Sequence, residues 1–383
     1  MGNLTMSAPI IVGNSSSDPA TLLLPTAAVW TFAVSGSTSC DIEQFPNTAI
    51  EGPPGGGGGA VGKMIIQSAA GASPYANFCT AGAFQTGSYY GYYRDSGFVV
   101  YNPNATTTTS GYAVVIISVA DDTTFSNVGT GDGTNNGFLI AHACCGASFY
   151  NLTANSADTG GVPLTIGDGI KADNSHDINF FGGSFDHAKP GDSEILFNEA
   201  PYVAGPDNFY GIYMEGNAHS PDTAPFINTG PNGVAFGVNF YGLTVFPMHA
   251  ENVYGIYVPS TGHIELTVSG MWERTFDTNA IEDTRHDVTI TAGEYGRIPV
   301  YNSYGFVTSS GVAGAVPVSA EKGTVTLASG SGSVSLAFTH TPICTATDTT
   351  APNPVKATAT AKTLAVTGTG SDVISYICIG NPD

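Results

Sequence analysis

The sequence predicts an all-β protein, in which a right-handed parallel β-helix is followed by a separate C-terminal β-sandwich. Three observations predict it: the composition, a repeat in the middle of the chain, and a change of pattern near residue 310. Charged residues make up 11% of the 383 residues, against about 25% in ordinary globular domains. The polar surface must therefore come from Thr, Ser and Asn, which suit strands and tight turns better than helices.

The repeat consists of short alternating triplets with a period of 22 to 23 residues. Leu243–Val245, Leu266–Val268 and Val288–Ile290 each read apolar, polar, apolar, as a strand with one buried face does. The segment Tyr210–Met214 returns as Tyr254–Val258 two such steps later. This pattern is typical of a fold in which each coil stacks its inward side chains on the next. Packed antiparallel sandwiches are the alternative, and they would lack this long-range register.

Two further motifs indicate equivalent strands in successive coils. Phe149–Leu152 repeats the pattern of Phe125–Val128, in which Phe is followed two positions later by Asn, after a step of 24 residues. The order Asn, aromatic, aromatic, Gly recurs at Asn179, Asn208 and Asn239, with longer steps that imply insertions between the coils.

The chain divides into three regions. Residues 1–110 are expected to form an N-terminal cap, a docking region or irregular first coils, and the sequence leaves these three alternatives open. The β-helix is expected over residues 111–308. A Gly/Ser-rich linker at 309–314 precedes residues 319–383, where about six short strands separated by turn residues predict the β-sandwich.

The charge balance excludes some partners. Ten basic residues against 31 acidic ones give a net charge of −21, which repels phosphate backbones and argues against nucleic acid. No apolar stretch reaches the roughly 18 residues of a membrane span, so no membrane insertion is expected. The sequence has no CxxC pair and no calcium-loop pattern, so we expect no metal and no cofactor.

The cysteines give two expectations. The adjacent Cys144 and Cys145 are expected to be packed thiols rather than a vicinal disulfide. Cys344 and Cys378 lie on two predicted strands of the C-terminal region, and a disulfide and two buried thiols remain open as alternatives.

The C-terminal residues carry a resemblance. The run GTVTLASGSGSVSLAFTH and the residues after it, Gly323–Pro382, resemble a C-terminal domain of bacteriophage tail fibre and tailspike proteins. The runs SHDINFFGGSF and HDVTITAG resemble coils of the pectate-lyase-like β-helices in such tailspikes. The resemblance implies a homotrimer on the virion that acts outside the cell, contacts other virion proteins, and binds and in many members cleaves bacterial surface polysaccharide. The N-terminal region resembles no virion-anchoring domain, which leaves attachment to a particle open.

Cleavage of a glycan requires two carboxylates facing one groove. The window richest in carboxylates runs from Trp272 to Asp277. In it, Glu273 is a candidate general acid and Asp277 a candidate base, while Trp272 offers a stacking surface and Arg274 a contact for a charged sugar. The alternative, which we favour, is that Trp272 caps the core and the charges are solvated.

Glu215 is a further candidate carboxylate in a tyrosine-rich neighbourhood, with Tyr213 and Tyr257 as candidate substrate-binding residues. The tyrosines considered for a carbohydrate-stacking wall are Tyr210, Tyr213, Tyr241, Tyr254 and Tyr257. Alternating aromatic residues on strands are more often core or subunit contacts, so that alternative is preferred. Asp186 and His187 follow a predicted strand, and a role in a turn is preferred over catalysis for them.

Three functions follow from these expectations. The first is a tailspike-like receptor-binding protein that recognises bacterial surface polysaccharide and cleaves it with a carboxylate pair. The second is a binding or structural virion appendage without catalysis. The third is a secreted polysaccharide lyase or hydrolase, which ten basic residues support weakly. The sequence does not decide whether the protein is an enzyme.

Overall fold

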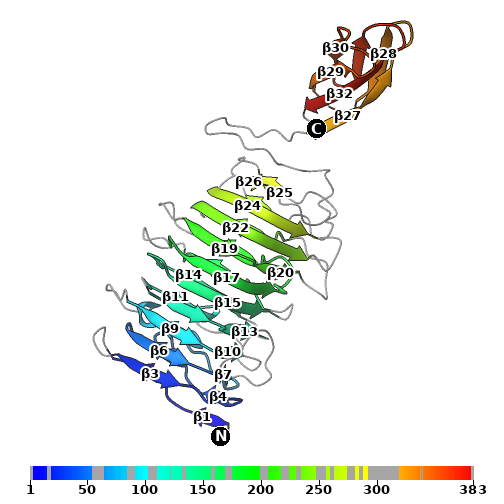
Figure 1. Cartoon of the computed structure of the whole chain (residues 1–383). Coiled ribbons are helices and arrows are strands. Elements are labelled where there is room, and N and C mark those ends of the chain that lie inside the picture. The colour runs from blue at the N-terminus through cyan, green and yellow to red at the C-terminus, as the bar shows by residue number, and fades with distance from the viewer. Residues whose placement is uncertain are drawn as a thin grey trace. The chain divides into compact units, whose positions relative to one another are not determined.

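The structure, a computed structural model, contains two β units (Figure 1). One unit comprises residues 1–288 and 293–297, and the other comprises residues 289–292 and 298–383. The structure describes residues 3–14, 19–53, 64–83, 91–101, 110–120, 122–131, 135–156, 160–168, 175–198, 206–216, 224–229, 234–246, 256–258, 263–273, 281–283, 288–291, 319–336, 338 and 340–380.

The first unit is a parallel β-helix, because every strand pairing recorded in it is parallel and joins strands of successive coils. Its larger sheet has 16 described strands. They are β1 (Leu4–Met6), β3 (Ala20–Leu23), β4 (Val29–Phe32), β6 (Thr48–Glu51), β7 (Met64–Ser68), β9 (Tyr93–Ser96), β10 (Phe98–Tyr101), β12 (Thr124–Ser126), β13 (Gly129–Gly131), β15 (Ser148–Asn155), β17 (Asn179–Asp186), β19 (Asp207–Tyr210), β20 (Tyr213–Glu215), β22 (Val234–Phe246), β24 (His263–Glu273) and β26 (Val288–Thr291).

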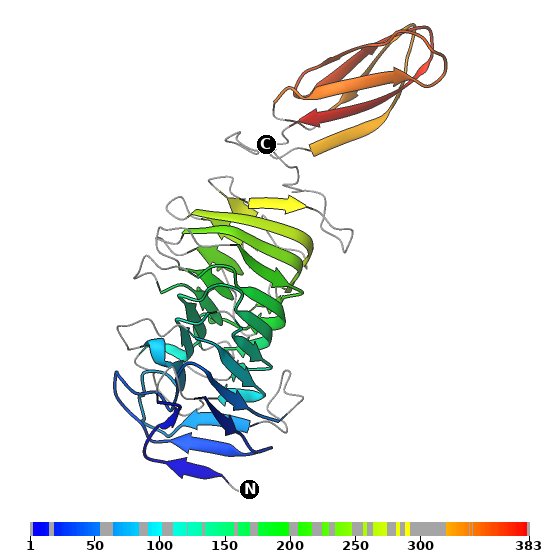
Figure 2. The same ribbon diagram turned by 60° about the vertical axis from the view of Figure 1, so that its left-hand side comes forward.

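The second sheet of this unit has ten described strands, stacked in chain order. They are β2 (Ile10–Val12), β5 (Ile42–Gln44), β8 (Phe78–Thr80), β11 (Tyr112–Ile117), β14 (Asn136–Ala141), β16 (Leu164–Ile166), β18 (Ile195–Phe197), β21 (Ile227–Thr229), β23 (Ile256–Val258) and β25 (Ile281–Asp283). A 3₁₀ turn, η1 (Ala81–Ala83), follows β8. Figure 2 shows the same stack of strands after rotation.

The larger sheet bends into two limbs. The first limb runs through β3, β6, β9, β12 and the start of β15, and the second runs through β4, β7, β10, β13 and the end of β15 (Figure 1). At the bend, five successive coils have a Gly or Asn with a positive φ: Asn127 (53°), Asn151 (52°), Gly182 (65°), Gly211 (65°) and Gly242 (74°). Glycine and asparagine tolerate this left-handed conformation best. In four of these five coils the Gly or Asn follows two aromatic residues, and this recurring motif is the sequence signal of the bend.

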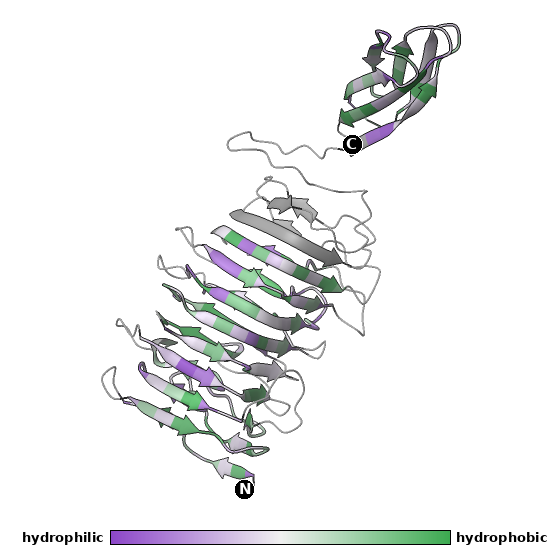
Figure 3. Ribbon diagram, viewed as in Figure 1, coloured by the Kyte–Doolittle hydropathy of each residue, from purple (hydrophilic) through white to green (hydrophobic). Residues whose placement is uncertain are grey.

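Alternation along each strand builds the core. In the first limb, five phenylalanines are register partners and are fully buried: Phe125, Phe149, Phe180, Phe209 and Phe240. Their ring centroids lie 5.7, 4.8, 4.5 and 4.4 Å apart in stacked geometry. Figure 3 shows the alternation as hydrophobic and hydrophilic bands along the strands.

The recurring motifs predicted the register, whereas the triplets did not. Phe125–Ser126 pairs with Phe149–Tyr150, and Asn179, Asn208 and Asn239 are register partners, so both of these expectations are confirmed. The step from Asn179 to Asn208 is 29 in sequence, and the step from Asn208 to Asn239 is 31.

The predicted period of the triplets is wrong. Leu266–Val268 pairs with Val238–Phe240, and Leu243–Val245 pairs with Met271–Glu273. The triplets therefore belong to different limbs. The echo of Tyr210–Met214 also fails, because Ile256–Val258 is β23 of the other sheet.

The described strands before residue 110 belong to the same two sheets as those after it. β1 pairs with β4, β2 pairs with β5, and β8 pairs with β11, all in parallel. These strands therefore continue both parallel sheets towards the N-terminus. Cys40, which lies before β5, forms a disulfide with Cys79 of β8.

The C-terminal unit is a β-sandwich of two antiparallel three-stranded sheets, as expected. One sheet has the order β27 (Ser319–Thr326), β32 (Val373–Gly380), β29 (Ile343–Asp348), and the other has the order β28 (Ser331–Ser335), β31 (Thr363–Thr367), β30 (Lys356–Ala359). Leu364, Val366 and Ile374 lie in its core. Cys344 and Cys378 face each other on β29 and β32 and form a disulfide. Among the described residues, no helix is long and apolar enough to cross a membrane.

Three buried aspartates in the β-helix hold protons near neutral pH. Burial raises the pKa of Asp95 to about 8, although hydrogen bonds from Gln44 Nε2 (2.8 Å) and the Ile50 N–H (3.0 Å) act to lower it. Burial likewise raises the pKa of Asp207 to about 8 and that of Asp41 to about 7. The native state therefore binds more protons than the unfolded state between about pH 4 and pH 8.

We expect the free energy of unfolding to fall as pH rises from 5 to 8. A carboxyl group whose pKa is raised by folding makes its full contribution to the free energy of unfolding at pH values below its unfolded pKa. This contribution is lost as pH rises through the folded pKa, at up to about 1.4 kcal/mol per pH unit. In Asp95→Asn the neutral amide should make this slope shallower. Asp122→Asn, at an exposed aspartate, is the control. Urea unfolding at several pH values measures the slopes, and equal slopes for Asp95→Asn and wild type would contradict the prediction.

Candidate functional site

An exposed aromatic ladder crosses four coils on the outside of the first limb. It consists of Tyr150, Phe181, Tyr210 and Tyr241, which are successive register partners on β15, β17, β19 and β22. The ring centroids are 4.9, 5.1 and 4.9 Å apart, with interplanar angles of 14°, 6° and 12°. Their exposed fractions are 41, 36, 37 and 40%. Four large rings are thus kept at the surface along roughly 15 Å, three steps of about 5 Å.

An amide ladder runs beside the exposed aromatic ladder, two residues earlier on the same strands. It consists of Asn179, Asn208 and Asn239. Asn208 Nδ2 donates to Asn179 Oδ1 at 3.1 Å, and Asn239 Nδ2 donates to Asn208 Oδ1 at 3.1 Å. Residues two apart on a strand share a face. The outside of the first limb therefore presents parallel rows of apolar rings and of polar amides.

A cluster of ionisable groups lies on the second limb of the same coils. We call Asp186, His187, Tyr213 and Glu215 the acid cluster. Asp186 and Glu215 are register partners on β17 and β20, and the Glu215 N–H donates to Asp186 Oδ1 at 3.1 Å. The Tyr213 hydroxyl donates to Glu215 Oε2 at 2.8 Å, and His187 Nε2 lies 3.8 Å from Glu215 Oε1.

The surroundings set the protonation of the acid cluster. Burial raises the pKa of Asp186 to about 7, and the negative charge of Glu215 acts in the same direction, whereas the Ser184 hydrogen bond and His187 oppose it. Burial and the hydrogen bond to Glu215 raise the pKa of Tyr213. Below about pH 7, Asp186 is thus a carboxylic acid beside a second carboxyl group on the next coil. This is the kind of pair that carries general acid catalysis.

The structure brings some of the predicted site residues together. Glu215 and Tyr213 meet in the acid cluster. Trp272 is the register partner of Thr244, which is itself the partner of Tyr213, so these three positions lie in one column across successive coils. Glu273 is the register partner of Val245 on the neighbouring strand β22.

Other predicted residues lie elsewhere. Tyr257 is on β23 in the ten-stranded sheet, apart from Tyr213. Arg274, Asp277 and Tyr254 lie outside the described residues. Of the tyrosines considered for a carbohydrate-stacking wall, Tyr210 and Tyr241 belong to the exposed aromatic ladder.

Sequence reasoning missed Tyr150 and Phe181 as ladder members and Asp186 as the neighbour of Glu215. A signal for the pair was present, since the step from Asp186 to Glu215 equals the step from Asn179 to Asn208, 29 in both cases. Extending the register of the Asn179 motif along β17 to its last residue would have found the pair.

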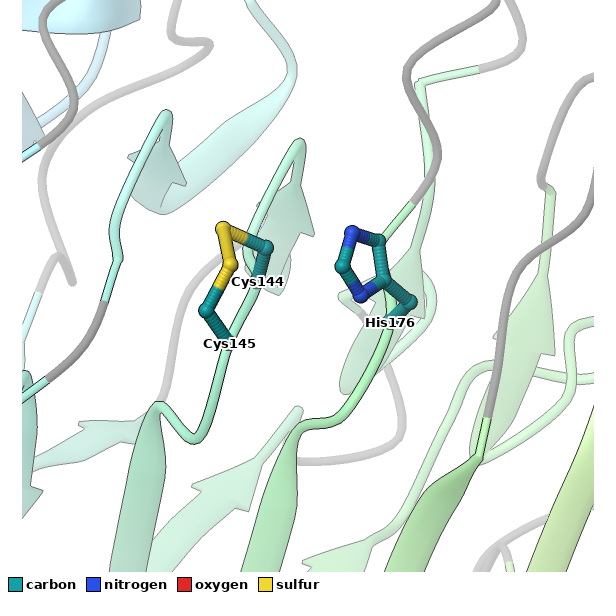
Figure 4. A group of neighbouring side chains, drawn as sticks. All are labelled: Cys144, Cys145 and His176. Atoms are coloured by element: carbon teal, nitrogen blue, oxygen red, sulfur yellow. A yellow bond between two sulfur atoms is a disulfide. The ribbon is translucent and has the colours of Figure 1, made fainter.

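A second cluster lies in the turns before β15 and β17. Cys144 and Cys145 form a vicinal disulfide, so the expectation of packed thiols is wrong. They lie in a turn where Cys145 has a φ of 67°. His176 lies beside them in the neighbouring coil, with candidate ligand atoms of all three residues within 4.8 Å of one another (Figure 4). Disulfide sulfurs are not thiolates, which are the form of cysteine that binds metals.

The likeness of this chain to known proteins is weak. No protein-family model matches the chain, and no curated protein sequence matches it. Among solved structures, the chain is similar to the tailspike protein gp49 from Acinetobacter baumannii bacteriophage Fri1, a capsular polysaccharide depolymerase. The identity is 10%, the match covers 95% of this chain and 80% of that chain, and the TM-score is 0.24. A likeness at this level assigns no site and no activity to this chain.

Proposed function

We propose that this protein is a tailspike-like receptor-binding protein that recognises bacterial surface polysaccharide on the outside of its first limb. The observation that carries the proposal is the exposed aromatic ladder with the amide ladder beside it. Apolar ring surface takes up the C–H groups of a sugar, and amides exchange hydrogen bonds with its hydroxyls. The net charge of −21 favours a neutral polymer over an acidic one.

The regular spacing of these groups suits a repeating ligand. Side chains on successive coils recur about every 4.8 Å, so a polymer lying along the stack would meet the same ring and amide at each step. The alternative occupant of this face is another copy of the chain, because exposed aromatic rows also form subunit contacts.

We expect the double variant Phe181→Ser/Tyr210→Ser to bind polysaccharide at least about tenfold more weakly than wild type, since it removes the two central rings. The control is Tyr92→Ser, which removes an exposed tyrosine outside the ladder. Binding is measured by biolayer interferometry against immobilised capsule and O-antigen preparations from a panel of bacteria. If wild type binds and the double variant binds equally well while remaining folded, the ladder is not the glycan site.

We also propose a homotrimer in a phage tail appendage, in contact with other virion proteins. The support is the resemblance of the C-terminal residues to tail fibre and tailspike domains. Analytical ultracentrifugation tests it, and a sedimentation mass of one chain would contradict the trimer.

Cleavage of the bound glycan is the second candidate function, and the acid cluster favours it. The attachment points of Asp186 and Glu215 are register partners one strand spacing apart, about 4.8 Å, so both carboxyl groups belong to one neighbourhood, as glycoside hydrolysis requires. Assaying reducing ends after incubation with each polysaccharide that binds tests this function. Binding without new reducing ends across the panel would leave a purely adhesive appendage.

A further inference from the structure

The exposed aromatic ladder ends abruptly at a serine. Tyr150 stacks on Phe181 on one side, and its register partner on the other side is Ser126, followed by Ser96 one coil further. The two inner rings of the ladder have both faces covered by ring neighbours. Among the described residues, Tyr150 has ring contact on one face only. Tyr150 has the highest exposed fraction of the four rings, 41%.

Ser126 stands at the position in the column where the next ring of the ladder would lie, and we call this position the gap. Coils in a parallel sheet are about 4.8 Å apart, so a flat ring over Ser126 would lie at the same distance from Tyr150 as Phe181 does on the other side. The four stacked rings present their edges to solvent along the ladder. On the Ser126 side no described residue stacks a ring on Tyr150, so at this end the described surface can offer an aromatic face to a ligand.

Polar groups line the floor of this gap. Asn127 Nδ2 donates to Ser126 Oγ at 3.1 Å, and Asn151 Nδ2 donates to Asn127 Oδ1 at 2.9 Å. Hydroxyl and amide groups beside an aromatic face are what a pyranose needs, since its C–H face is apolar and its rim carries hydroxyls. If another aromatic ring occupied this position instead of a sugar, these hydroxyl and amide groups would gain no hydrogen-bond partner from it.

We infer that the Tyr150 end of the ladder is a stacking subsite for one neutral pyranose ring, with Ser126 and Asn127 as its hydrogen-bonding floor. This inference rests on the proposed glycan recognition and identifies the position where a single sugar unit is held. The ring edges along the rest of the ladder guide the polymer towards it.

The test is saturation-transfer NMR with methyl glucoside, methyl galactoside and methyl glucuronide on four proteins: wild type, Ser126→Ala, Ser126→Tyr and Tyr150→Ser. Ser126→Tyr adds a fifth ring to the ladder and fills the gap, whereas Ser126→Ala keeps the gap open. Tyrosine is already accommodated in this column at three other coils. Melting curves confirm that each variant is folded.

We expect ring-proton saturation of a neutral glycoside with wild type and Ser126→Ala, and its loss with Ser126→Tyr and Tyr150→Ser. The affinity for a bound polysaccharide should also fall about three- to tenfold in those two variants. Undiminished saturation with Ser126→Tyr, or saturation by the glucuronide alone, would overturn the inference. If wild type binds polysaccharide but no glycoside, the subsite is refuted and the proposed function stands. If wild type binds no polysaccharide, the proposed function itself fails.

Discussion

Replacing Phe209 by alanine is expected to lower the free energy of unfolding by about 3–5 kcal/mol, the usual cost of removing a buried phenylalanine. Phe209 is fully buried in the middle of the inner stack, with ring centroids 4.5 Å from Phe180 and 4.4 Å from Phe240. A third ring, Phe197 from the ten-stranded sheet, meets it edge-on at 6.0 Å. The substitution therefore removes contacts with both neighbouring coils and with the opposite sheet.

The matched control is Tyr210→Ala, one residue along the same strand. Tyr210 also stacks between two rings, Phe181 and Tyr241, but it lies on the outside and its exposed fraction is 37%. Its loss should cost about 1 kcal/mol, the contribution of ring pairs without core burial. Urea unfolding followed by far-UV circular dichroism measures both variants. Equal losses would mean that stacking between coils, rather than burial, sets the stability of the β-helix.

The sequence predicted the fold class because the alternation of apolar and polar residues is visible without knowing the register. The register itself depended on the kind of motif. Every strand of either limb alternates, so a triplet such as Leu243–Val245 does not reveal the limb to which it belongs. A motif that includes the bend, such as the one beginning at Asn179, is anchored to a residue that must adopt positive φ. That anchor is why the motif predicted the pairing correctly.

The candidate site was less predictable for a related reason. The step between coils is not constant, since it is 24 from Asn127 to Asn151 and 31 from Asn208 to Asn239. A position cannot be carried from one coil to another without an anchor in each, so the pairing of Glu273 with Val245 was not predictable from the triplets. The disulfide of Cys144 and Cys145 depends on the turn geometry, which adjacency in sequence does not specify.

On any glycan that the wild-type protein cleaves, Asp186→Asn is expected to slow cleavage by about 10²–10⁴-fold, the contribution of a positioned general acid. Burial raises the pKa of Asp186 to about 7, so the group is protonated and able to donate below that pH. The wild-type rate should therefore fall as pH rises above about 7. Glu215→Gln should be similarly slow, because Glu215 is the second carboxyl group of the pair and is oriented by the Tyr213 hydroxyl at 2.8 Å.

The control for the acid cluster is Asp192→Asn, which removes a carboxylate that pairs with Lys189 at 3.2 Å, outside the cluster. It should cleave at the wild-type rate, and all three variants should bind the polysaccharide as wild type does, because the aromatic and amide ladders remain intact. Reducing-end assays across pH, together with interferometry, separate the two effects. Full activity in Asp186→Asn would place the cleavage centre elsewhere, whereas loss of binding in Asp186→Asn would mean that the acid cluster contributes to glycan recognition rather than to proton transfer.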